Sequence, residues 1–583
     1  MTVARIGIGQ INPRMGDFEG NTRLILEAAA KARDSGVQLL IFPEMALTGF
    51  STDDLAGRDS FVAAAVAAMS AVARALARSR MLLVVGGLEN DDALYKGAAV
   101  IHRGEILGFA RKRYLFCCGR YDESRYFSAG ERTLVIETDK FRAAVTLGDD
   151  LGYPVFPAEI ELLLNLWNEP YHFGHRPVRE RMMIERSRED AVAMVLASPV
   201  GGHDDLLFEG ASVVVDGFGE VIARGRSLSP DLVVADLDLR ELKAHRARIF
   251  HSSRPRPESL SKVKLVRLLD PWPEKRKPAR IQSRIEPRPK GPPEIFSAIV
   301  VATRDFVAKN GFGQAFIGLS GGIDSALTAA IAAEALGPKL VTAVSMPSPY
   351  NSDETKRDAR ATAKNLGIRF RQIPITALFS SALAALAPAF KRRPPDVTEE
   401  NLQARLRGLL LMALANKAKG VVLASGNKSE LATGYCTLYG DTVGAFAPLK
   451  DLYKTQVFQL AEWYNHHQGR DLIPRSVIER PPSAELRPGQ TDQDTLPPYP
   501  TLDRILAGLV EKGHSMAELI DEGEDEETVR AVFRLLLSSE FKRRQYPIGP
   551  SVSERPLTDL TFPITKKIGW WETDPPAGKD NHE

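Results

Sequence analysis

A glycine-rich turn between two apolar stretches is the sharpest chemical signal in the chain. It runs over residues 318–325 as GLSGGIDS, after the apolar AFI and before SALTAAIAAEAL. Ser320, Gly321 and Gly322 allow a backbone to wrap closely around a polyphosphate, and a following helix N-terminus adds a favourable dipole. Asp324 can bind a magnesium ion on the phosphates. The turn lacks the terminal lysine of a Walker loop, so it predicts a phosphate site of another type.

The same turn resembles the phosphate loop of the ATP pyrophosphatase family, whose members activate a carbonyl oxygen by adenylation and release pyrophosphate. The resemblance lies in SGGIDS, placed between a strand pattern and a helical pattern. It implies that ATP binds along the whole loop, at Gly318, Leu319, Ser320, Gly321, Gly322, Ile323, Asp324 and Ser325.

Further segments of the C-terminal half resemble the NAD synthetase family. They are EENLQARLRG (399–408), ASGNKSEL (424–431), GYCTLYGD (434–441), PLKDLYKT (448–455), PSAELRPGQ (482–490) and EFKRRQ (540–545). Their order and spacing cover nearly all of residues 293–565. The resemblance implies ATP-dependent amidation of deamido-NAD to NAD, with AMP and pyrophosphate as the other products.

Charged residues in these segments suit that chemistry. The nicotinate carboxylate of deamido-NAD accepts ammonia poorly until ATP converts it to an acyl adenylate. Asp324 and Glu430 offer the hard carboxylate oxygens that magnesium prefers. Lys454 and Lys542 can neutralise phosphate charge.

Arg405 and Arg407 stand two residues apart in one predicted helix, so they point to different faces. One of them could serve a nucleotide while the other makes a structural pair. The resemblance assigns catalysis to Asp324, Glu430 and Lys454, and it assigns magnesium binding to the carboxylates of Asp324 and Glu430. It also assigns a further ATP contact to Ser425. It assigns deamido-NAD binding to Asn401, Arg405, Glu430, Tyr435, Cys436, Thr437, Leu438, Asp441 and Lys542.

The first 240 residues resemble the nitrilase, or carbon–nitrogen hydrolase, superfamily. The resemblance is carried by FPEMALTGF (42–50), KRYL (112–115), YDESRYF (121–127) and GDDL (148–151). Such a domain hydrolyses glutamine with a Glu as general base, a Lys that stabilises the oxyanion and a Cys nucleophile. Glu44 and Lys112 match the first two, whereas Gly148 stands where the Cys is expected. We therefore expect a vestigial glutaminase and an enzyme that uses free ammonia.

Several alternatives stay open on the sequence alone. Lys112 could belong to an exposed basic cluster with its two arginine neighbours. Cys117 or Cys118 could replace the nucleophile, although both lie on the lysine's own segment, and Trp167 could fill an emptied glutamine pocket. The chain could also be a glutamine-dependent enzyme with an unrecognised nucleophile, could take ammonia from a separate amidase partner, or could be a non-catalytic regulatory or scaffold protein.

The elements that must position these residues follow from hydrophobic periodicity. Residues 3–240 alternate strand and helix patterns with hairpin-like neighbours, which predicts an α/β domain with a mixed sheet; the resemblance implies an α-β-β-α sandwich. From residue 293 strands and helices alternate regularly, which predicts a doubly wound parallel sheet. We expect a nitrilase-like domain at 1–267, a Pro-rich basic linker with almost nothing to bury at 268–292, and a synthetase domain at 293–583.

Composition limits the partners. The 583 residues carry 76 Lys and Arg against 74 Asp and Glu, a net charge of +2, which gives no reason to expect nucleic acid or a membrane as partner. Three cysteines rule out a disulfide scaffold, and no signal peptide or apolar run long enough for a membrane span is present, so we expect a cytoplasmic protein. The resemblance implies ATP, Mg²⁺, deamido-NAD and ammonia as small-molecule partners and a homo-oligomer formed through the synthetase domains.

Overall fold

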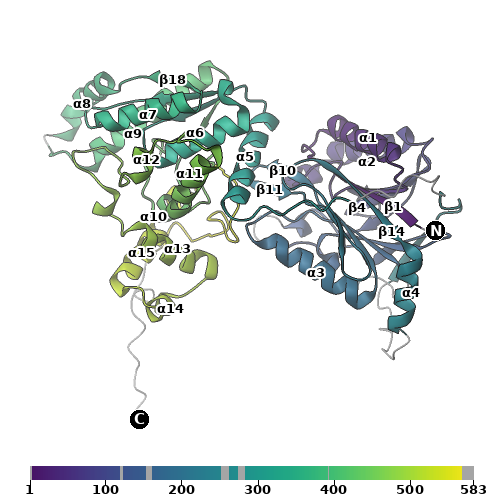
Figure 1. The fold of residues 1–583 in the computed structure, drawn as a ribbon. Coiled ribbons are helices and arrows are strands. Elements are labelled where there is room, and N and C mark those ends of the chain that lie inside the picture. The colour runs from purple at the N-terminus through teal and green to yellow at the C-terminus, as the bar shows by residue number, and fades with distance from the viewer. Residues whose placement is uncertain are drawn as a thin grey trace, which may run out of the picture. The chain divides into compact units, whose positions relative to one another are not determined.

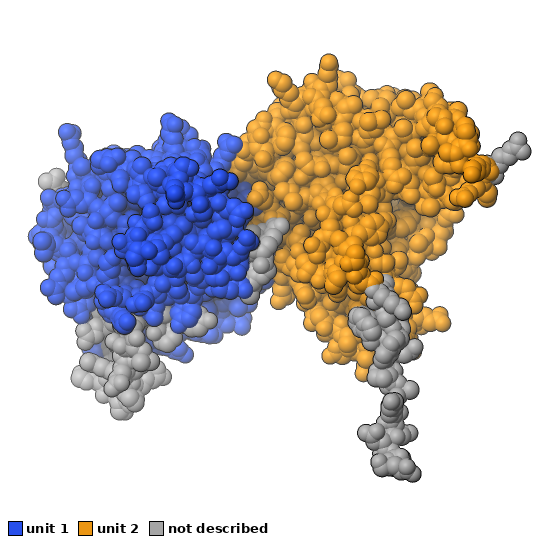
Figure 2. Space-filling view, turned by 180° about the vertical axis from the view of Figure 1, so that it is seen from behind, with its two compact units in different colours: residues 1–203, 207–289 blue, residues 204–206, 290–583 orange. Residues whose placement is uncertain are grey.

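The protein is described by a computed structural model over residues 3–117, 122–152, 160–250, 262–273, 283–391 and 393–566. The chain divides into two compact units, shown in blue and orange in Figure 2. Unit 1 comprises Met1–His203 and Leu207–Pro289, and unit 2 comprises Asp204–Leu206 and Lys290–Glu583. No helix within the described ranges is long and apolar enough to cross a membrane.

A six-stranded mixed sheet forms one half of unit 1 (Figure 1). Its first three strands in sequence are parallel because helices α1 (Phe18–Asp34) and α2 (Asp59–Ala75) cross over between them, whereas the next two follow as antiparallel neighbours across short turns. The strands, in spatial order, are β14 (Asp231–Asp238), β1 (Val3–Gln10), β2 (Leu39–Ile41), β3 (Leu82–Asn90), β4 (Leu94–His102) and β5 (Glu105–Arg111).

A seven-stranded sheet forms the other half, and its central strands β7, β8 and β9 are parallel. Helix α3 (His175–Asp190) connects β8 to β9, and α4 (Leu239–Phe250) follows β14. A separate pair joins β10 (Val200–His203) to β11 (Leu206–Glu209). The seven strands, in spatial order, are β13 (Val221–Arg224), β12 (Val213–Val215), β9 (Ala193–Ala197), β8 (Leu162–Leu166), β7 (Arg142–Leu147), β6 (Arg132–Glu137) and β15 (Lys262–Arg267).

Alternating side chains divide unit 1 into layers. Leu39 and Ile41 of β2 face the second sheet and join one core with Leu164 of β8, whereas Leu40 faces α1 and α2. Leu163 of β8 likewise faces α3 in a third core. Because each sheet is apolar on both faces, helices must cover the outer ones, and the expected α-β-β-α sandwich with mixed sheets is confirmed.

The expectation that the Pro-rich segment buries almost nothing is wrong at one residue. Trp272 is 5% exposed and packs edge-on against Phe141, with ring centroids 4.8 Å apart, in the core between the two sheets. The stretch 283–291 carries no helix, and α5 begins at Pro292. A single aromatic side chain therefore anchors a segment whose composition otherwise indicates an exposed linker.

Unit 2 is built on a four-stranded parallel sheet in the order β18 (Arg369–Gln372), β17 (Val341–Ser345), β16 (Ala315–Gly318) and β19 (Val421–Leu423). The predicted strand–helix alternation is confirmed, although α8 was not predicted. The helices around the sheet are α5 (Pro292–Lys309), α6 (Ile323–Leu336), α7 (Asp353–Asn365), α8 (Thr376–Phe390), α9 (Val397–Lys417), α10 (Lys428–Thr433), α11 (Lys454–Gln468) and α12 (Arg475–Glu479).

A helical subdomain completes unit 2 beyond the sheet. It contains α13 (Tyr499–Ala507), α14 (Met516–Asp521), α15 (Glu526–Ser538) and α16 (Glu540–Arg543), and the apolar faces of the first three contribute to its core. At its base the fully buried ammonium of Lys428 contacts Asp451 at 3.0 Å and Glu511 at 2.8 Å, and donates to Ser553 Oγ and the Arg555 carbonyl. These contacts join α10 to segments from three distant parts of the sequence.

Candidate functional site

The phosphate loop connects β16 to α6 as the sequence predicts. Gly321 has φ +94°, and a Cβ there would collide with the carbonyl oxygen of Thr355 at the start of α7, so only glycine fits. The Ser320 hydroxyl lies 3.1 Å from Ser325 Oγ and accepts from the backbone N–H of Gly322 at 3.2 Å. The loop therefore presents a fixed backbone concavity at the N-terminus of a 14-residue helix, which is an anion-binding geometry.

A cavity of about 290 Å³ opens above this loop. All eight predicted ATP-loop residues line it, as do Ser425, Glu430 and Lys454. Of the residues predicted for deamido-NAD, Tyr435 and Asp441 also line the cavity, whereas the others lie outside it: Asn401, Arg405, Cys436, Thr437, Leu438 and Lys542.

Two carboxylates and a lysine meet at one side of the cavity. Lys454 Nζ lies 2.5 Å from Asp324 Oδ2 and 3.1 Å from Glu430 Oε1, and Asn427 donates to Asp324 Oδ1 at 2.8 Å. Burial raises the pKa of Glu430 to about 8, against the attraction of Lys454. The predicted catalytic set Asp324, Glu430 and Lys454 is thus brought together from α6, α10 and α11.

The donor set suits magnesium on a polyphosphate. The carboxylates of Asp324 and Glu430 both contact the Lys454 ammonium, at 2.5 and 3.1 Å, so they lie close to each other. No three His, Cys, Asp or Glu side chains of the described residues form a metal-ligand group. Magnesium fits such a site because it commonly takes one or two protein carboxylates and completes its shell with phosphate and water oxygens.

Asp492 is a site residue that the sequence reading missed. Its carboxylate lines the same cavity and accepts from Tyr499 OH at 2.8 Å and Tyr435 OH at 3.3 Å. Burial raises its pKa. Asp492 lies in the segment TDQD, which directly follows the PSAELRPGQ motif. Extending that motif by two residues would have included it.

Most residues predicted for deamido-NAD gather around the turn 435–441. Asn401 accepts from Thr437 Oγ1 at 2.7 Å, and Arg405 donates to the Leu438 carbonyl at 3.2 Å. Asp441 accepts from the backbone N–H of Thr437 at 2.6 Å. Helix α9 and this turn therefore form one surface beside the cavity.

Lys542 and Cys436 belong to the same surface. The Lys542 ammonium donates to the carbonyls of Gly434 at 2.6 Å and Cys436 at 2.8 Å, so it holds the backbone of the turn. Burial raises the pKa of the Cys436 thiol to about 12, which leaves it neutral and unreactive at physiological pH.

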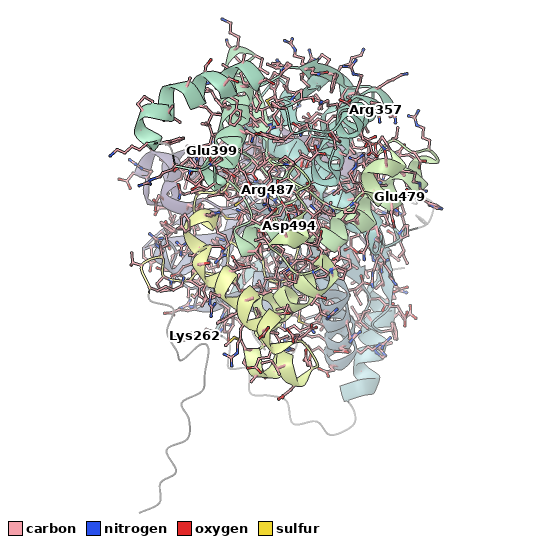
Figure 3. All side chains as sticks on the ribbon, turned by 90° about the vertical axis from the view of Figure 1, so that its left-hand side faces the viewer. Lys262, Arg357, Glu399, Glu479, Arg487 and Asp494 are labelled. Atoms are coloured by element: carbon pink, nitrogen blue, oxygen red, sulfur yellow. The ribbon has the colours of Figure 1, made fainter. Side chains whose placement is uncertain are left out.

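A strap over residues 481–486 also lines the cavity, and Arg480 just before it donates to the Gly321 carbonyl of the phosphate loop at 3.3 Å. Glu485 accepts from Asn351 Nδ2 and Thr355 Oγ1, both at 2.9 Å, and the Leu486 carbonyl accepts from Gln403 Nε2 at 3.0 Å. Just beyond the strap, Arg487 pairs with Asp494 at 3.0 Å. Figure 3 labels both residues. The strap is therefore tied to α7 and α9.

Unit 1 holds a second cluster of buried charges. Lys112 contacts Glu44 at 3.4 Å and Glu123 at 3.0 Å, and Lys96 contacts the same carboxylates at 3.3 and 2.5 Å. All four side chains are at most 8% exposed, so the alternative that Lys112 sits in an exposed basic cluster is wrong. The sequence reading missed Lys96, which lies on β4, and Glu123, which begins a 3-10 turn (Glu123–Arg125) eleven residues after Lys112.

Gly148 lies at the centre of this cluster, directly after β7, with φ +48°. A Cβ at this position would be 2.9 Å from Lys112 Nζ and 3.2 Å from Glu44 Oε2. Residue 148 thus lies beside the two side chains that the resemblance assigns as general base and oxyanion lysine. Glycine supplies no side-chain atom there.

The remaining candidates of unit 1 are two cysteines and Trp167, which follows the β8 residue paired with Leu147. Cys117 is exposed and its Sγ contacts the Leu115 carbonyl at 3.3 Å. Cys118 lies outside the described residues. Trp167 is buried in the core between the seven-stranded sheet and α3, with the Arg179 guanidinium 5.9 Å from its ring centre.

Comparisons with known proteins extend over both units. The NAD synthase family matches residues 295–546, and the carbon-nitrogen hydrolase family matches residues 5–247. The chain is 42% identical over 572 residues to a glutamine-dependent NAD(+) synthetase of Thermotoga maritima, covering 97% of this chain and 99% of that protein. It is 37% identical to one of Aquifex aeolicus, covering 96% and 99%.

A solved structure covers the same length. The glutamine-dependent NAD+ synthetase of Acinetobacter baumannii in complex with ADP matches with a TM-score of 0.71 and 34% identity, covering 97% of this chain and 98% of that one.

Proposed function

The chain belongs to the family of two-domain NAD synthetases, and from that premise we propose that it forms NAD from deamido-NAD, ATP and free ammonia. As a member of this family it is a carbon–nitrogen ligase. Its dependence on free ammonia rests on one observation: Gly148 occupies the point between Glu44 and Lys112 where a thiol would have to stand.

The synthetase cavity carries the groups that the reaction needs. Adenylation joins a carboxylate oxygen of deamido-NAD to the α-phosphorus of ATP and breaks the bond to pyrophosphate. The phosphate-loop amides and the α6 dipole would hold the triphosphate, and Lys454 would neutralise charge that develops on the leaving pyrophosphate. A magnesium ion held by Asp324 and Glu430 would add positive charge on the same phosphates.

The second step joins ammonia to the activated carbon. The nitrogen attacks the acyl carbon, AMP leaves with the bridging oxygen, and nitrogen releases a proton to give the amide. Only the unprotonated form has the electron pair that attacks, so the rate at fixed total ammonium should rise with pH. The surface made by α9 and the turn 435–441 would hold the dinucleotide so that its nicotinate reaches the cavity.

The relatives favour an alternative, because proteins that match nearly the whole chain at 34–42% identity are named glutamine-dependent. Under that reading an unrecognised nucleophile completes the Glu44–Lys112 pair. Supply of ammonia by a separate amidase is a second alternative. A non-catalytic scaffold is disfavoured by the complete phosphate loop with its carboxylate–lysine cluster.

A side-by-side assay of NAD formation with glutamine and with ammonium chloride tests the proposal. We expect turnover with ammonium and none with glutamine, because losing a covalent nucleophile costs several orders of magnitude. Glutamine-driven turnover in protein freed of contaminating glutaminase would overturn the ammonia assignment. Absence of ATP turnover with either nitrogen source would favour the scaffold.

We also propose a homo-oligomer through unit 2. Helices α8 and α9 expose large apolar side chains, among them Leu378 at 42%, Leu409 at 63% and Met412 at 38%. On α9, Leu409 and Met412 lie on a different face from Ala404, Arg407 and Leu411, which line the cavity. A patch of this kind is typical of a protein interface, and a second copy is the occupant that the family resemblance suggests. Light scattering of the wild type and of Leu409→Glu tests it; a monomeric wild type would exclude it.

A further inference from the structure

Arg407 projects from α9 into the wall of the nucleotide cavity. Its Nε donates to the Met346 carbonyl at 3.0 Å, and its Nη2 donates to Asn351 Oδ1 at 3.2 Å. Both acceptors are neutral, and both lie in the loop that follows β17. The guanidinium is therefore fixed on one edge while its Nη1 atom hydrogen-bonds to no described residue.

No carboxylate of the described part of the chain forms an ion pair with Arg407. Glu485 attracts it from a greater distance, but the bonded oxygen of that carboxylate already accepts from Asn351 and Thr355. Burial lowers the pKa of Arg407 to about 10, so the group stays charged at neutral pH. A charge that is largely withdrawn from water and has no counter-charge is costly unless a ligand supplies one.

Three other cations of unit 2 differ from Arg407 in this respect. Lys454 contacts two carboxylates in the same cavity, and Lys428 contacts two at the base of the helical subdomain. Arg480, at the start of the strap, pairs with Asp358 and Glu354. Arg407 thus places at the cavity wall a positive charge that no described carboxylate neutralises, so an anion bound in the cavity could pair with it.

We propose that Arg407 binds an oxyanion of the substrates, and that this oxyanion is a phosphate of the nucleotide. The inference rests on the proposed function, and it adds a substrate-binding residue to that site. A guanidinium is suited to the role because its planar donors match the geometry of phosphate oxygens.

The nucleotide is favoured over the dinucleotide by the two faces of α9. Arg407 lines the cavity together with the phosphate loop, whereas Arg405 points to the turn 435–441 and donates to Leu438. Both arginines are thus accounted for: one faces the loop predicted for ATP, and the other faces the residues predicted for deamido-NAD.

The test measures binding directly, without turnover. The full-length protein is titrated by calorimetry with α,β-methylene-ATP and, separately, with deamido-NAD. Arg407→Met and Arg407→Gln should weaken binding of the ATP analogue roughly ten- to a hundredfold, the loss expected for one hydrogen bond to a charged group. Arg407→Lys should recover part of the affinity, because it keeps the charge but not the planar fork.

Lys417→Met, at the exposed end of the same helix, controls for removal of one positive charge. Arg407→Gln keeps a side-chain donor, so it tests the charge if the methionine variant melts early. Unchanged affinity for both ligands in Arg407→Gln would overturn the inference. Weakening of deamido-NAD alone would keep the oxyanion contact but overturn its assignment to the nucleotide. A wild type that binds neither ligand would contradict the proposed function itself.

Discussion

Each unit buries lysines against carboxylates at the carboxyl ends of parallel strands, yet the two clusters differ in what they surround. In unit 2 Asp324, Glu430 and Lys454 border a cavity that continues into the phosphate loop. In unit 1 Glu44 and Lys112, with two partners, surround a glycine. Buried charges persist because each compensates another, since removing one leaves its partners unpaired. A buried charge cluster therefore indicates how a fold is stabilised, and only the reacting atoms indicate which reaction a site can carry out.

The largest expected effect is a loss of NAD formation, which should follow from substitutions in the unit 2 cluster and not from one in the unit 1 cluster. Asp324→Ala and Glu430→Ala should each lower ammonia-driven NAD formation about a thousandfold or more, because charge stabilisation on the phosphates is lost. Glu44→Gln, the matched change in unit 1, should leave that rate unchanged. Steady-state NAD formation with ammonium chloride measures both, with circular dichroism to confirm folding. A strong loss in Glu44→Gln would show that unit 1 still takes part in the chemistry.

The next effect is on stability. Glu123→Gln should destabilise unit 1 by about 3–5 kcal/mol, because two buried lysines lose a shared carboxylate. Burial alone would raise the pKa of Glu123, but Lys96 and Lys112 lower it to about 2. A depressed carboxyl pKa stabilises the fold above the unfolded value, near 4.3, and this contribution disappears as the pH falls towards 2.

Hydrogen exchange followed by mass spectrometry can report each unit separately. Faster exchange in unit 1 peptides of Glu123→Gln, with unit 2 peptides unaffected, is the expected pattern. The variant should also lose the steep acid dependence between these two pH values. Equal protection in both proteins would show that the cluster contributes little to stability.

Lys542→Ala should have a smaller effect, confined to one substrate. Its ammonium holds the carbonyls of Gly434 and Cys436, so the turn 435–441 loosens when it is removed. We expect deamido-NAD affinity to fall roughly ten- to a hundredfold, and ATP affinity to fall far less. Equilibrium titration with each substrate tests this, and Lys417→Met again controls for charge. Equal losses for both substrates would place Lys542 in a general structural role.

Gly148→Cys should have the smallest effect. Residue 148 has φ +48°, which strains any residue with a side chain, and its Cβ would press on Lys112 Nζ at 2.9 Å. The lysine end can shift slightly, so the variant should fold and keep ammonia-driven turnover. We expect no glutamine-driven NAD formation, because a thiol alone does not rebuild a glutamine pocket. Restored glutamine use would show instead that the pocket is intact and lacks only its nucleophile.

Local motifs were predictable from the sequence, and long-range partners were not. The phosphate loop is predicted by contiguous residues because a strand, a glycine turn and a helix cap are all local features. Lys96 and Glu123 could not be found this way, since the pairing of β4 brings Lys96 to Glu44, and a short 3-10 turn brings Glu123 to Lys96 and Lys112. Arg407 was visible only as one of two candidates, because choosing between them requires knowing which face of α9 meets the cavity.

Two further differences between the sequence-based predictions and the structure, at Trp272 and at α8, come from side-chain packing. Nothing local to DPWP distinguishes a solvated tryptophan from Trp272 in the inter-sheet core, because its partner Phe141 lies more than a hundred residues earlier. Helix α8 lacks the polar face that marks a surface helix, and most of its side chains are nevertheless exposed. Periodicity cannot assign such a segment, since its apolar residues do not turn towards the core of their own unit.

The buried ammonium of Lys428 bears on how the chain matures during synthesis. Its partners include Asp451, Glu511 and two groups at residues 553 and 555. While translation proceeds, the sheet of unit 2 leaves the ribosome before those last partners do. Unit 2 can reach its final packing only after almost the entire polypeptide has been made, whereas domains nearer the amino end can fold earlier. A chain that stops short of residue 553 would leave a charge inside the protein without part of its shell, and degradation rather than assembly is its expected fate.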